Sequence, residues 1–562
     1  MGRLSTDVTA QTDERGNRTS TTVGELVVRL LEHWGVTHAF GVISIHNLPI
    51  LDPLGSRGRI RFICARGEAG AMNMADAYAR VTGGLGVAFT STGTAAGNAA
   101  GALIEALTAG SPVLHITGQV ESEHLDRNRA YIHEAPAQLQ MLQAVSKAAY
   151  RITTALELVP VLTRAAQAAL SAPSGPVSVE IPVDVQSAPV AMPTRLPDLE
   201  PRAVPALDAD VDSLAKLLQA SRRPMILLGG GARGSELEVE ALASLGIGFV
   251  TSTNGRGILR EDHPLSLGAF NCTSDVQALY DQCDLLIVAG SRLRGNETWT
   301  YQLRLPANLA VIDSDSGANG RTYPSRLFIH GDVRATLAGL CRRLASDWRA
   351  AADLKADIEA ARARMHAALR SQLGQYIPIV DSIQSRLPAN AAWVRDVTIS
   401  NSTWGNRYLR VGHSRAGVHA VGGGIGQGLP MAIGAALGSR EGAIVLSGDG
   451  GLTLCLGELA TLAETAPNVT LVLMNDAGYG VIRNIQDAEY GQRHFFADIL
   501  TPDFGKVAAA LGIRHEKVVA AKDFDAALAR ARAVPGPAIV EVDMVAIGPY
   551  PHRFAGPPRL PQ

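Results

Sequence analysis

Two aspartates stand where two apolar runs of the chain end. Asp449 follows the run at 443–447, and Asp476 follows the run at 469–474. Both runs have the character of buried strands, and a helix-period segment separates them. Adjacent parallel strands deliver their C-terminal ends to one crevice, so we expect the two carboxylates about one strand spacing apart. Paired oxygen ligands of this kind suit Mg²⁺, which commonly completes its octahedral shell with phosphate oxygens.

The glycines beside the first aspartate indicate what such a metal would accompany. Gly448, Gly450 and Gly451 surround Asp449 and let the backbone approach a ligand closely. Amides that open the following helix can then cradle phosphate oxygens. An Asp among glycines is also common in a simple turn and helix cap, but the second strand end, "NDAGYG" at 475–480, favours a ligand site. The pattern predicts a metal clamp for a diphosphate.

Length and composition limit the class of protein. The chain has 562 residues, too many for one core, with 46% hydrophobic residues, 19% charged residues and a net charge of −2. Without a basic surplus or a long apolar run, neither nucleic acid nor a membrane is expected as a partner. The five cysteines are far apart and odd in number, which disfavours a disulfide framework and a zinc site. We therefore predict a reducing, cytoplasmic location.

Short apolar runs alternate with helix-period segments along most of the chain. This alternation is typical of parallel sheets covered by helices, so the predicted fold is α/β, with three doubly wound parallel-sheet domains. A Pro-rich linker and a charged helical connector separate the domains, and a polar, disordered leader precedes them. The predicted order is leader 1–22, first domain 23–185, linker 186–206, central domain 207–345, connector 346–376 and last domain 377–562.

The central domain contains a GxGxxG pattern, "GGGARG" at 229–234, directly after a strand-like run. A dinucleotide site would also need a carboxylate at the end of the next strand to hold the ribose. That strand, "IGFVTS", ends instead in Ser252 and Thr253. A tight turn is therefore favoured over a nicotinamide site.

The motif GDG, followed some two dozen residues later by Asn-Asp and Gly-Tyr-Gly, is similar to the thiamin diphosphate motif. From about residue 23 to 550 the chain resembles the acetolactate synthase and 2-oxoacid decarboxylase group, which includes benzaldehyde lyase. The resemblance implies pyrimidine-binding, central and diphosphate-binding domains. It also implies that Asp449, Asp476 and the carbonyl of Gly478 ligate Mg²⁺. Asp476 departs from the family's usual Asn and adds one negative charge.

Two further segments carry the resemblance. In "HAVGGGIGQGLPMAIGAAL", Ile425 falls on the apolar residue that wedges between the two rings of the cofactor. In "ARGEAGAMNMADAYARVTG", Glu68 falls on the carboxylate that contacts the aminopyrimidine and, through its imino tautomer, promotes deprotonation of C2. The resemblance places further residues at the cofactor: Gly93, Gln119, Gly424, Gly448, Gly450, Gly451, Tyr479, Gly480 and Val481.

The resemblance also implies an assembly. In this family Glu68 of one chain and Asp449 of another build one site, so a homodimer is the minimum active unit and a homotetramer is common. An FAD in the central domain is allowed by the family analogy, although the residues there do not support it.

Family members attack a carbonyl, usually of a 2-oxoacid, and differ in whether the resulting enamine meets a proton, an aldehyde or a second 2-oxoacid. Ile45 stands where pyruvate decarboxylases carry an acid, and "TGQVESEHLDRN" lacks their paired histidines. An acetolactate synthase-like carboligase, with a 2-oxoacid and a carbonyl acceptor as substrates, is therefore preferred. The alternatives are a decarboxylase or acyloin lyase of the same family, a flavin or nicotinamide oxidoreductase, and a binding protein without turnover.

Two histidines are candidates for controlling that outcome. His46 and His133 fall, by motif alignment, on loops at strand ends of the first domain. An imidazole near neutral pKa can shuttle protons to an alkoxide, so both are predicted to face the reactive carbon and to act in catalysis with Glu68 and Gln119. A loop histidine is also often only a surface or capping residue, and that alternative stays open.

Overall fold

The computed structural model describes residues 20–554 and residue 556. Residues 1–19 of the predicted leader lie outside this range, but its last three residues do not. Ser20–Thr22 form strand β1, which pairs antiparallel with β8, Pro189–Ala191, inside the predicted linker. Residues 20–22 of the predicted leader therefore lie in a strand, ordered by main-chain hydrogen bonds to β8.

The described chain divides into two compact units. The first takes in residues up to Ala79 together with Gly84–Arg202, and the second takes in Arg80–Gly83 and the residues from Ala203 onward.

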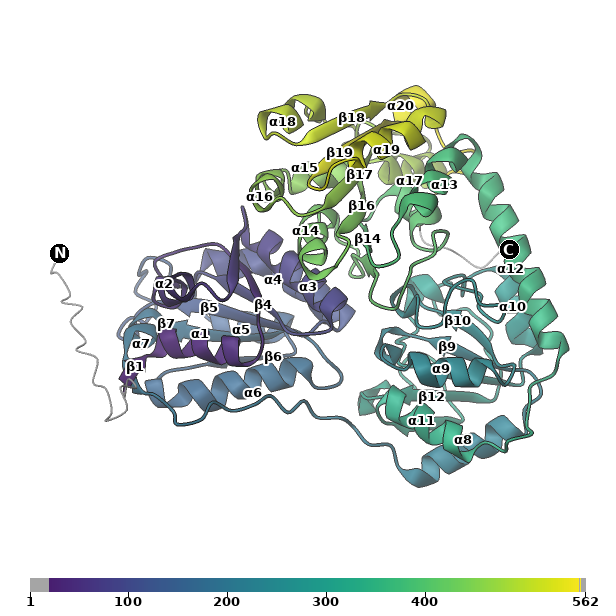
Figure 1. Ribbon diagram of the computed structural model, residues 1–562, viewed down its shortest axis with the longest axis horizontal. Coiled ribbons are helices and arrows are strands. Elements are labelled where there is room, and N and C mark those ends of the chain that lie inside the picture. Colours follow the sequence, from purple (N-terminus) through teal and green to yellow (C-terminus); the bar gives the residue numbers. More distant parts are fainter. Residues whose placement is uncertain (1–19, 555, 557–562) are drawn as a thin grey trace. The chain divides into compact units, whose positions relative to one another are not determined.

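The first unit holds a six-stranded parallel sheet in the order β3-β2-β4-β5-β7-β6 (Figure 1). Its strands are β2 His38–Gly41, β3 Arg61–Cys64, β4 Gly86–Thr90, β5 Val113–Gln119, β6 Ala148–Arg151 and β7 Val177–Pro182. Its helices are α1 Val23–His33, α2 Leu48–Arg57, α3 Glu68–Thr82, α4 Thr94–Ala109, α5 Gln138–Val145, α6 Leu158–Leu170 and α7 Val183–Ser187.

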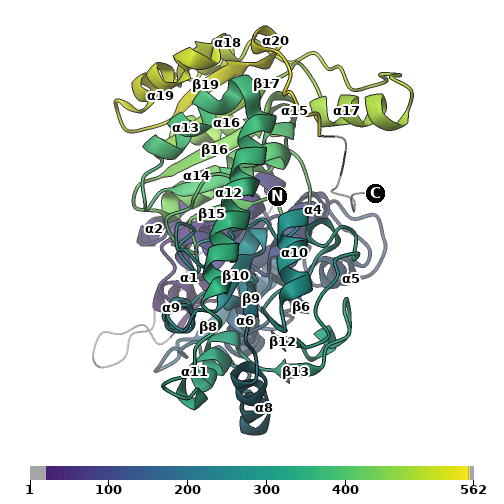
Figure 2. The ribbon, with the colours of Figure 1, turned by 90° about the vertical axis from the view of Figure 1, so that its right-hand side faces the viewer.

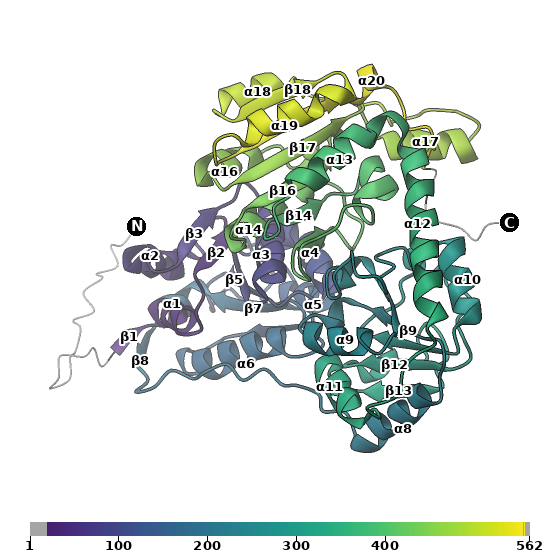
Figure 3. The same cartoon turned by 45° about the vertical axis from the view of Figure 1, so that its right-hand side comes forward.

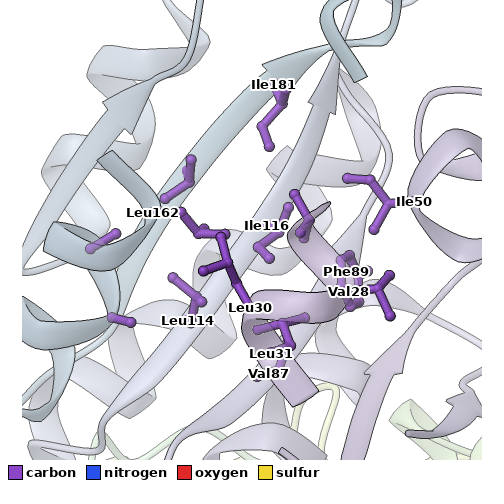
Figure 4. Close-up of a cluster of buried hydrophobic side chains, with 14 of the residues drawn as sticks. Val28, Leu30, Leu31, Ile50, Val87, Phe89, Leu114, Ile116, Leu162 and Ile181 are labelled. Atoms are coloured by element: carbon purple, nitrogen blue, oxygen red, sulfur yellow. The ribbon is translucent and has the colours of Figure 1, made fainter. Parts of the chain in front are cut away.

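Apolar side chains that recur every second residue in the strands and about every 3.6 residues in the helices pack together in the core of this unit (Figure 4). Alternate residues of the central strands, such as Leu114 and Ile116 of β5, point to one face of the sheet. Val28 and Leu31 of α1 and Leu162 of α6 pack against them. Burial of these apolar side chains fixes which face each helix covers and so holds the strand ends in place.

The second unit contains two sheets. The central sheet is parallel, in the order β10-β9-β11-β12-β13 (Figure 3). Its strands are β9 Pro224–Leu228, β10 Gly248–Thr251, β11 Leu285–Ala289, β12 Leu309–Asp313 and β13 Leu327–His330. Its helices are α8 Asp208–Gln219, α9 Glu236–Ala243, α10 Ser274–Gln282 and α11 Val333–Arg343.

The predicted connector is helical over α12, Asp353–Leu373 (Figure 2). Its buried residues recur every three or four positions, which gives the helix one apolar stripe. They are Leu354, Ile358, Ala361, Met365, Leu369 and Leu373. Several of them join a core cluster with the central strands, so α12 covers one face of the central sheet.

The last sheet has six parallel strands in the order β15-β14-β16-β17-β19-β18. Its strands are β14 Ala392–Arg395, β15 Gly417–His419, β16 Ala443–Gly448, β17 Val469–Asn475, β18 Arg514–Val518 and β19 Ala538–Asp543. Its helices are α13 Ile377–Arg386, α14 Gly428–Gly438, α15 Asp449–Leu454, α16 Glu458–Thr465, α17 Gly480–Glu489, α18 Phe504–Ala510, α19 Phe524–Arg532 and α20 Met544–Ile547.

The three parallel sheets, each flanked by helices, confirm the predicted fold class. Among the helices of the described residues, none combines the length and the apolar character needed to span a bilayer.

Candidate active site

The two strand-end aspartates lie together. β16 and β17 are parallel neighbours in which Gly448 pairs with Met474, so both strands end at the same level. Asp449 opens α15, and its carboxylate accepts hydrogen bonds from the backbone of the second strand end. The Oδ1 atom accepts from the amide of Asp476 at 3.3 Å, and Oδ2 accepts from the amide of Gly478 at 2.8 Å. The carboxylate of Asp449 therefore holds the turn that carries Asp476.

This pair of carboxylates carries an electrostatic penalty of its own. Asp449 is 1% exposed. Burial raises the pKa of Asp449, and burial followed by the charge of Asp449 raises the pKa of Asp476. Arg483 opposes the second shift, with Nη2 3.5 Å from Oδ2 of Asp476. A divalent cation would remove the repulsion between the two acids, so the donor set fits Mg²⁺.

The described residues contain no cluster of three His, Cys, Asp or Glu side chains able to hold a metal. A metal at this pair would therefore draw its other ligands from backbone oxygens, water or the oxygens of a bound diphosphate.

Glycines are required where the two strand-end turns touch. A Cβ on Gly450 would lie 2.7 Å from the ring of Tyr479, and one on Gly480 would lie 1.7 Å from Oδ2 of Asp476. Gly478 has φ +151°. Gly450 therefore permits close packing of the turn after β16 on the turn after β17, and Gly480 leaves room for the Asp476 side chain within the second turn. Val481 follows in the first turn of α17.

A third strand-end carboxylate, Asp396, was missed by sequence reasoning. It follows β14 and is fully buried, and burial raises its pKa to about 6. Its Oδ2 accepts from the amide of Gly426 and from Oγ of Ser447, each at 3.2 Å. The loop that carries Gly424 and Ile425 is thereby tied to the end of β16. The acid directly after the run "WVR" was the signal that could have revealed it.

The exposure of Ile425 differs from that of a core residue. Its side chain is 40% exposed, although it stands between the buried strand β15 and the buried helix α14. An apolar side chain presented in this way by a tethered loop suits contact with the rings of a cofactor.

In the first unit the predicted residues gather at the C-terminal edge of the sheet. Glu68 begins α3 after β3, and its Oε2 accepts a hydrogen bond from Nδ2 of Asn98 on α4 at 3.1 Å. Gly93 precedes α4 with φ +64°, and a Cβ there would lie 2.5 Å from the carbonyl oxygen of His133. The backbone of the His133 loop thus packs directly on the turn that follows β4.

Gln119, at the end of β5, belongs to a buried polar network. It is 2% exposed, and its Oε1 accepts from Oγ1 of Thr92 and from the amide of Val120, both at 2.8 Å. Thr92 and the amide of Gly93 also donate to Oε1 of Gln138, whose Nε2 donates to Glu180 at 2.9 Å. These contacts tie the side chain of Gln119 to the turn at Gly93. The sequence offered no signal for Gln138 or Glu180.

His46 and His133 form a pair. Their ring centroids are 5.0 Å apart in an edge-to-face arrangement. His46 is 4% exposed, with Nδ1 3.2 Å from Oγ of Ser91. Burial, followed by the neighbouring His133, lowers the pKa of His46, while Glu121 opposes the shift. The sequence search for adjacent histidines could not find this pair, because two separate loops supply it.

An unusual loop presents His133. Five non-glycine residues in it have positive φ, namely Asp126, Asn128, Ala130, His133 and Ala137. The carboxylate of Glu134 accepts from the amides of Asn128 at 2.7 Å, Arg129 at 3.1 Å and Tyr131 at 3.2 Å. These hydrogen bonds hold the loop in a conformation that L-residues rarely adopt.

The glycines of the central GxGxxG pattern pack against another turn. A Cβ on Gly229 would lie 2.1 Å from the carbonyl oxygen of Gly290, and one on Gly231 would lie 3.0 Å from its Cα. Gly290 follows β11 and has φ +62°. The pattern is needed for close contact between the turns after β9 and β11, which favours the tight-turn interpretation.

Comparison with known proteins gives matches along most of the chain. Three family models of thiamine pyrophosphate enzymes match: the N-terminal TPP binding domain at 21–142, the central domain at 211–340 and the C-terminal TPP binding domain at 398–542. A probable 2-ketoarginine decarboxylase from Pseudomonas aeruginosa is 34% identical, covering 87% of this chain and 88% of the relative. The acetolactate synthase isozyme 1 large subunit from Escherichia coli is 29% identical, covering 93% of each chain.

Proposed function

The chain belongs to the thiamine pyrophosphate enzymes, as a lyase or transferase of the acetolactate synthase and 2-oxoacid decarboxylase group. We propose that it is a Mg²⁺-dependent 2-oxoacid decarboxylase. One observation carries the cofactor assignment. Two carboxylates, the buried Asp449 and the half-buried Asp476, meet at the ends of adjacent parallel strands and share the backbone of one glycine turn.

Each part of the site has a separate task in this proposal. Asp449, Asp476 and the carbonyl of Gly478 would hold Mg²⁺, and the amides opening α15 would hold phosphate oxygens. Ile425, on the loop tied down by Asp396, would press against the rings of the cofactor. Glu68 would hold a proton at the aminopyrimidine. When bound, thiamin diphosphate supplies a C2 nucleophile and an electron sink for loss of CO₂.

The histidine pair favours protonation as the outcome of the reaction. His46 is buried, its pKa is lowered, and His133 lies beside it at the exposed end of the pair. A neutral imidazole beside a second, more exposed imidazole can pass a proton inward from solvent. The decarboxylated fragment would then leave as an aldehyde. The 34% identical relative, a probable 2-ketoarginine decarboxylase, supports the same outcome.

Carboligation, as in the acetolactate synthases, is the second candidate. Ile45, beside His46, is 65% exposed and offers no acid to protonate the fragment. An apolar side chain there suits a second carbonyl compound as the acceptor. Acetolactate synthase large subunits also align over most of this chain.

A panel of 2-oxoacids separates the two candidates. CO₂ release, free aldehyde and ligated product should be measured for pyruvate, 2-oxobutyrate and a guanidino 2-oxoacid, with and without added aldehyde. Aldehyde equimolar with CO₂ supports the decarboxylase. Ligated product equimolar with CO₂ supports addition of the decarboxylated fragment to a second 2-oxoacid, and ligated product equal to half the CO₂ supports joining of two decarboxylated fragments. Activity that persists without thiamin diphosphate would contradict the proposal.

We also propose that the active unit is a homodimer, in which Glu68 of one chain serves Asp449 of the other. Mixing the inactive variants Glu68→Gln and Asp449→Ala tests this arrangement. Subunit exchange gives half heterodimers, each with one intact site, so about a quarter of wild-type activity should return. If the variants demonstrably exchange subunits and no activity returns, the site does not form across chains.

A further inference from the structure

A cavity of about 320 Å³ lies in the second unit, and neither aspartate of the pair lines it. Its walls come from α12, from α13, from the segment 261–262 that precedes α10 and from the segment 408–410. Figure 2 shows α12 running along the central sheet toward α13. None of the residues assigned to the cofactor lines this cavity.

The carboxylates that line the cavity already have partners. Glu261 pairs with the buried Arg256 at 2.7 Å. Asp262 pairs with Arg260 at 2.8 Å, and Asp381 pairs with Arg370 at 2.7 Å. Each lining acid is therefore neutralised by an arginine that does not line the cavity.

The lining arginines have no carboxylate partner of this kind. Arg362 donates through Nη1 to the backbone carbonyls of His263 at 2.6 Å and Ser266 at 3.1 Å, and these acceptors carry no charge. Arg410 is held at its amide by Oε1 of Gln384 at 2.6 Å. Across residues 20–554 its guanidinium forms no ion pair within 4.0 Å. Its charge helps to lower the pKa of Asp262, but that carboxylate is already paired with Arg260. The cavity therefore has two surplus positive charges.

Two polar side chains complete the lining. The ring of His366 lies 5.2 Å from Phe270 and 5.4 Å from Tyr408, centroid to centroid. Burial, followed by the charges of Arg362 and Arg410, lowers the pKa of His366, so the ring is a neutral hydrogen-bonding group. The hydroxyl of Tyr408 accepts from Arg370 at 2.7 Å and keeps its own proton to donate.

We propose that this cavity binds a small dianion, a dicarboxylate or a phosphate, between the guanidinium groups of Arg362 and Arg410. The planar guanidinium fork matches carboxylate and phosphate oxygens, and the volume is that of a small-molecule site. The lining joins the central domain, α12 and the last domain, so a bound dianion would link all three segments.

Calorimetric titration of the holoenzyme, saturated with Mg²⁺ and thiamin diphosphate, tests the proposal. Inorganic phosphate and succinate serve as probes at constant ionic strength. At least one probe should bind with a stoichiometry of one per chain. Loss of one charge-assisted contact in Arg410→Gln should weaken binding about tenfold or more. Tight binding of phosphate alone identifies a phosphate site, and tight binding of succinate alone identifies a dicarboxylate site.

The control variant is Arg304→Gln, which removes an exposed, paired arginine of the same unit and should bind as the wild type does. Arg410→Lys keeps the charge and should recover part of the affinity. The proposal is overturned if neither probe saturates, or if Arg410→Gln binds the probes as tightly as the wild type and the control.

Discussion

Asp476→Asn should stabilise the cofactor-free protein at neutral pH and weaken the pH dependence of its Mg²⁺ affinity. The substitution keeps the size of the side chain and one carbonyl oxygen, but it removes the half-buried charge that neighbours the buried Asp449. Because burial and Asp449 raise the pKa of Asp476 in the folded state, ionisation at this position opposes folding. The destabilisation is absent below the unfolded pKa, grows as pH rises toward the folded pKa of about 7, and is constant above it.

The size of the effect follows from the geometry. The carboxylate of Asp449 touches the backbone of residue 476, and two charges about 4 Å apart repel by roughly 4 kcal/mol at an effective dielectric constant near 20. Arg483, 3.5 Å from Asp476, offsets part of this repulsion. A net gain of about 1–3 kcal/mol in the variant is therefore expected. For a domain of about 150–250 residues, each kcal/mol added to the free energy of unfolding raises Tm by roughly 2–4 °C.

Differential scanning calorimetry of the cofactor-free protein between pH 5 and pH 8.5 measures the gain. The Tm difference between variant and wild type should widen up to about pH 7 and then level off. Mg²⁺ affinity of the wild type should tighten as pH rises, because the ligating carboxylates must lose protons, and this dependence should be weaker in the variant. Asp525→Asn is the control of opposite sign, because Arg386 lowers the pKa of that exposed carboxylate. Equal Tm values for variant and wild type at every pH would refute the reasoning.

Four further substitutions probe the rest of the site. Asp449→Ala should abolish retention of thiamin diphosphate in equilibrium dialysis, and a folded variant that keeps normal retention would contradict the metal assignment. Glu68→Gln should bind the cofactor but slow hydrogen–deuterium exchange at C2 by at least about a hundredfold, and an unchanged exchange rate by NMR would point to another base. His46→Ala should lower the ratio of aldehyde to CO₂ more than it lowers the rate of CO₂ release; an unchanged ratio and rate would remove this histidine from the mechanism. Asp396→Asn should raise the concentration of thiamin diphosphate needed for half-maximal activity, because the Ile425 loop loses a charged anchor, while kcat at saturation changes less; the opposite pattern would mean that Asp396 acts on the chemistry.

The sequence alone was sufficient to predict the features that depend on neighbouring residues in the chain, namely the sheet domains and the strand ends. Apolar periodicity predicted three parallel-sheet domains, because burial of one helix stripe or one strand face repeats at short, readable intervals. An apolar run followed by glycine, asparagine or aspartate marks the end of a strand. The order of apolar runs and turns was therefore enough to place Asp449 and Asp476 at one sheet edge. The same reasoning favoured a tight turn over a dinucleotide site for the glycines at 229–234, since the expected carboxylate was missing after the next strand.

Tertiary structure alone decided which distant residues meet. His46 and His133 are 87 positions apart in the chain and become neighbours only because β2 and β5 end at one edge of the same sheet. Gln138 and Glu180 support the turn at Gly93 from elements that share no motif with it. The role of Asp396 depends on a tertiary contact, because its carboxylate accepts a hydrogen bond from the amide of Gly426 in the loop of Ile425. Local sequence patterns record which face is buried, whereas side-chain contacts between separate loops depend on sheet order and register, which those patterns do not encode.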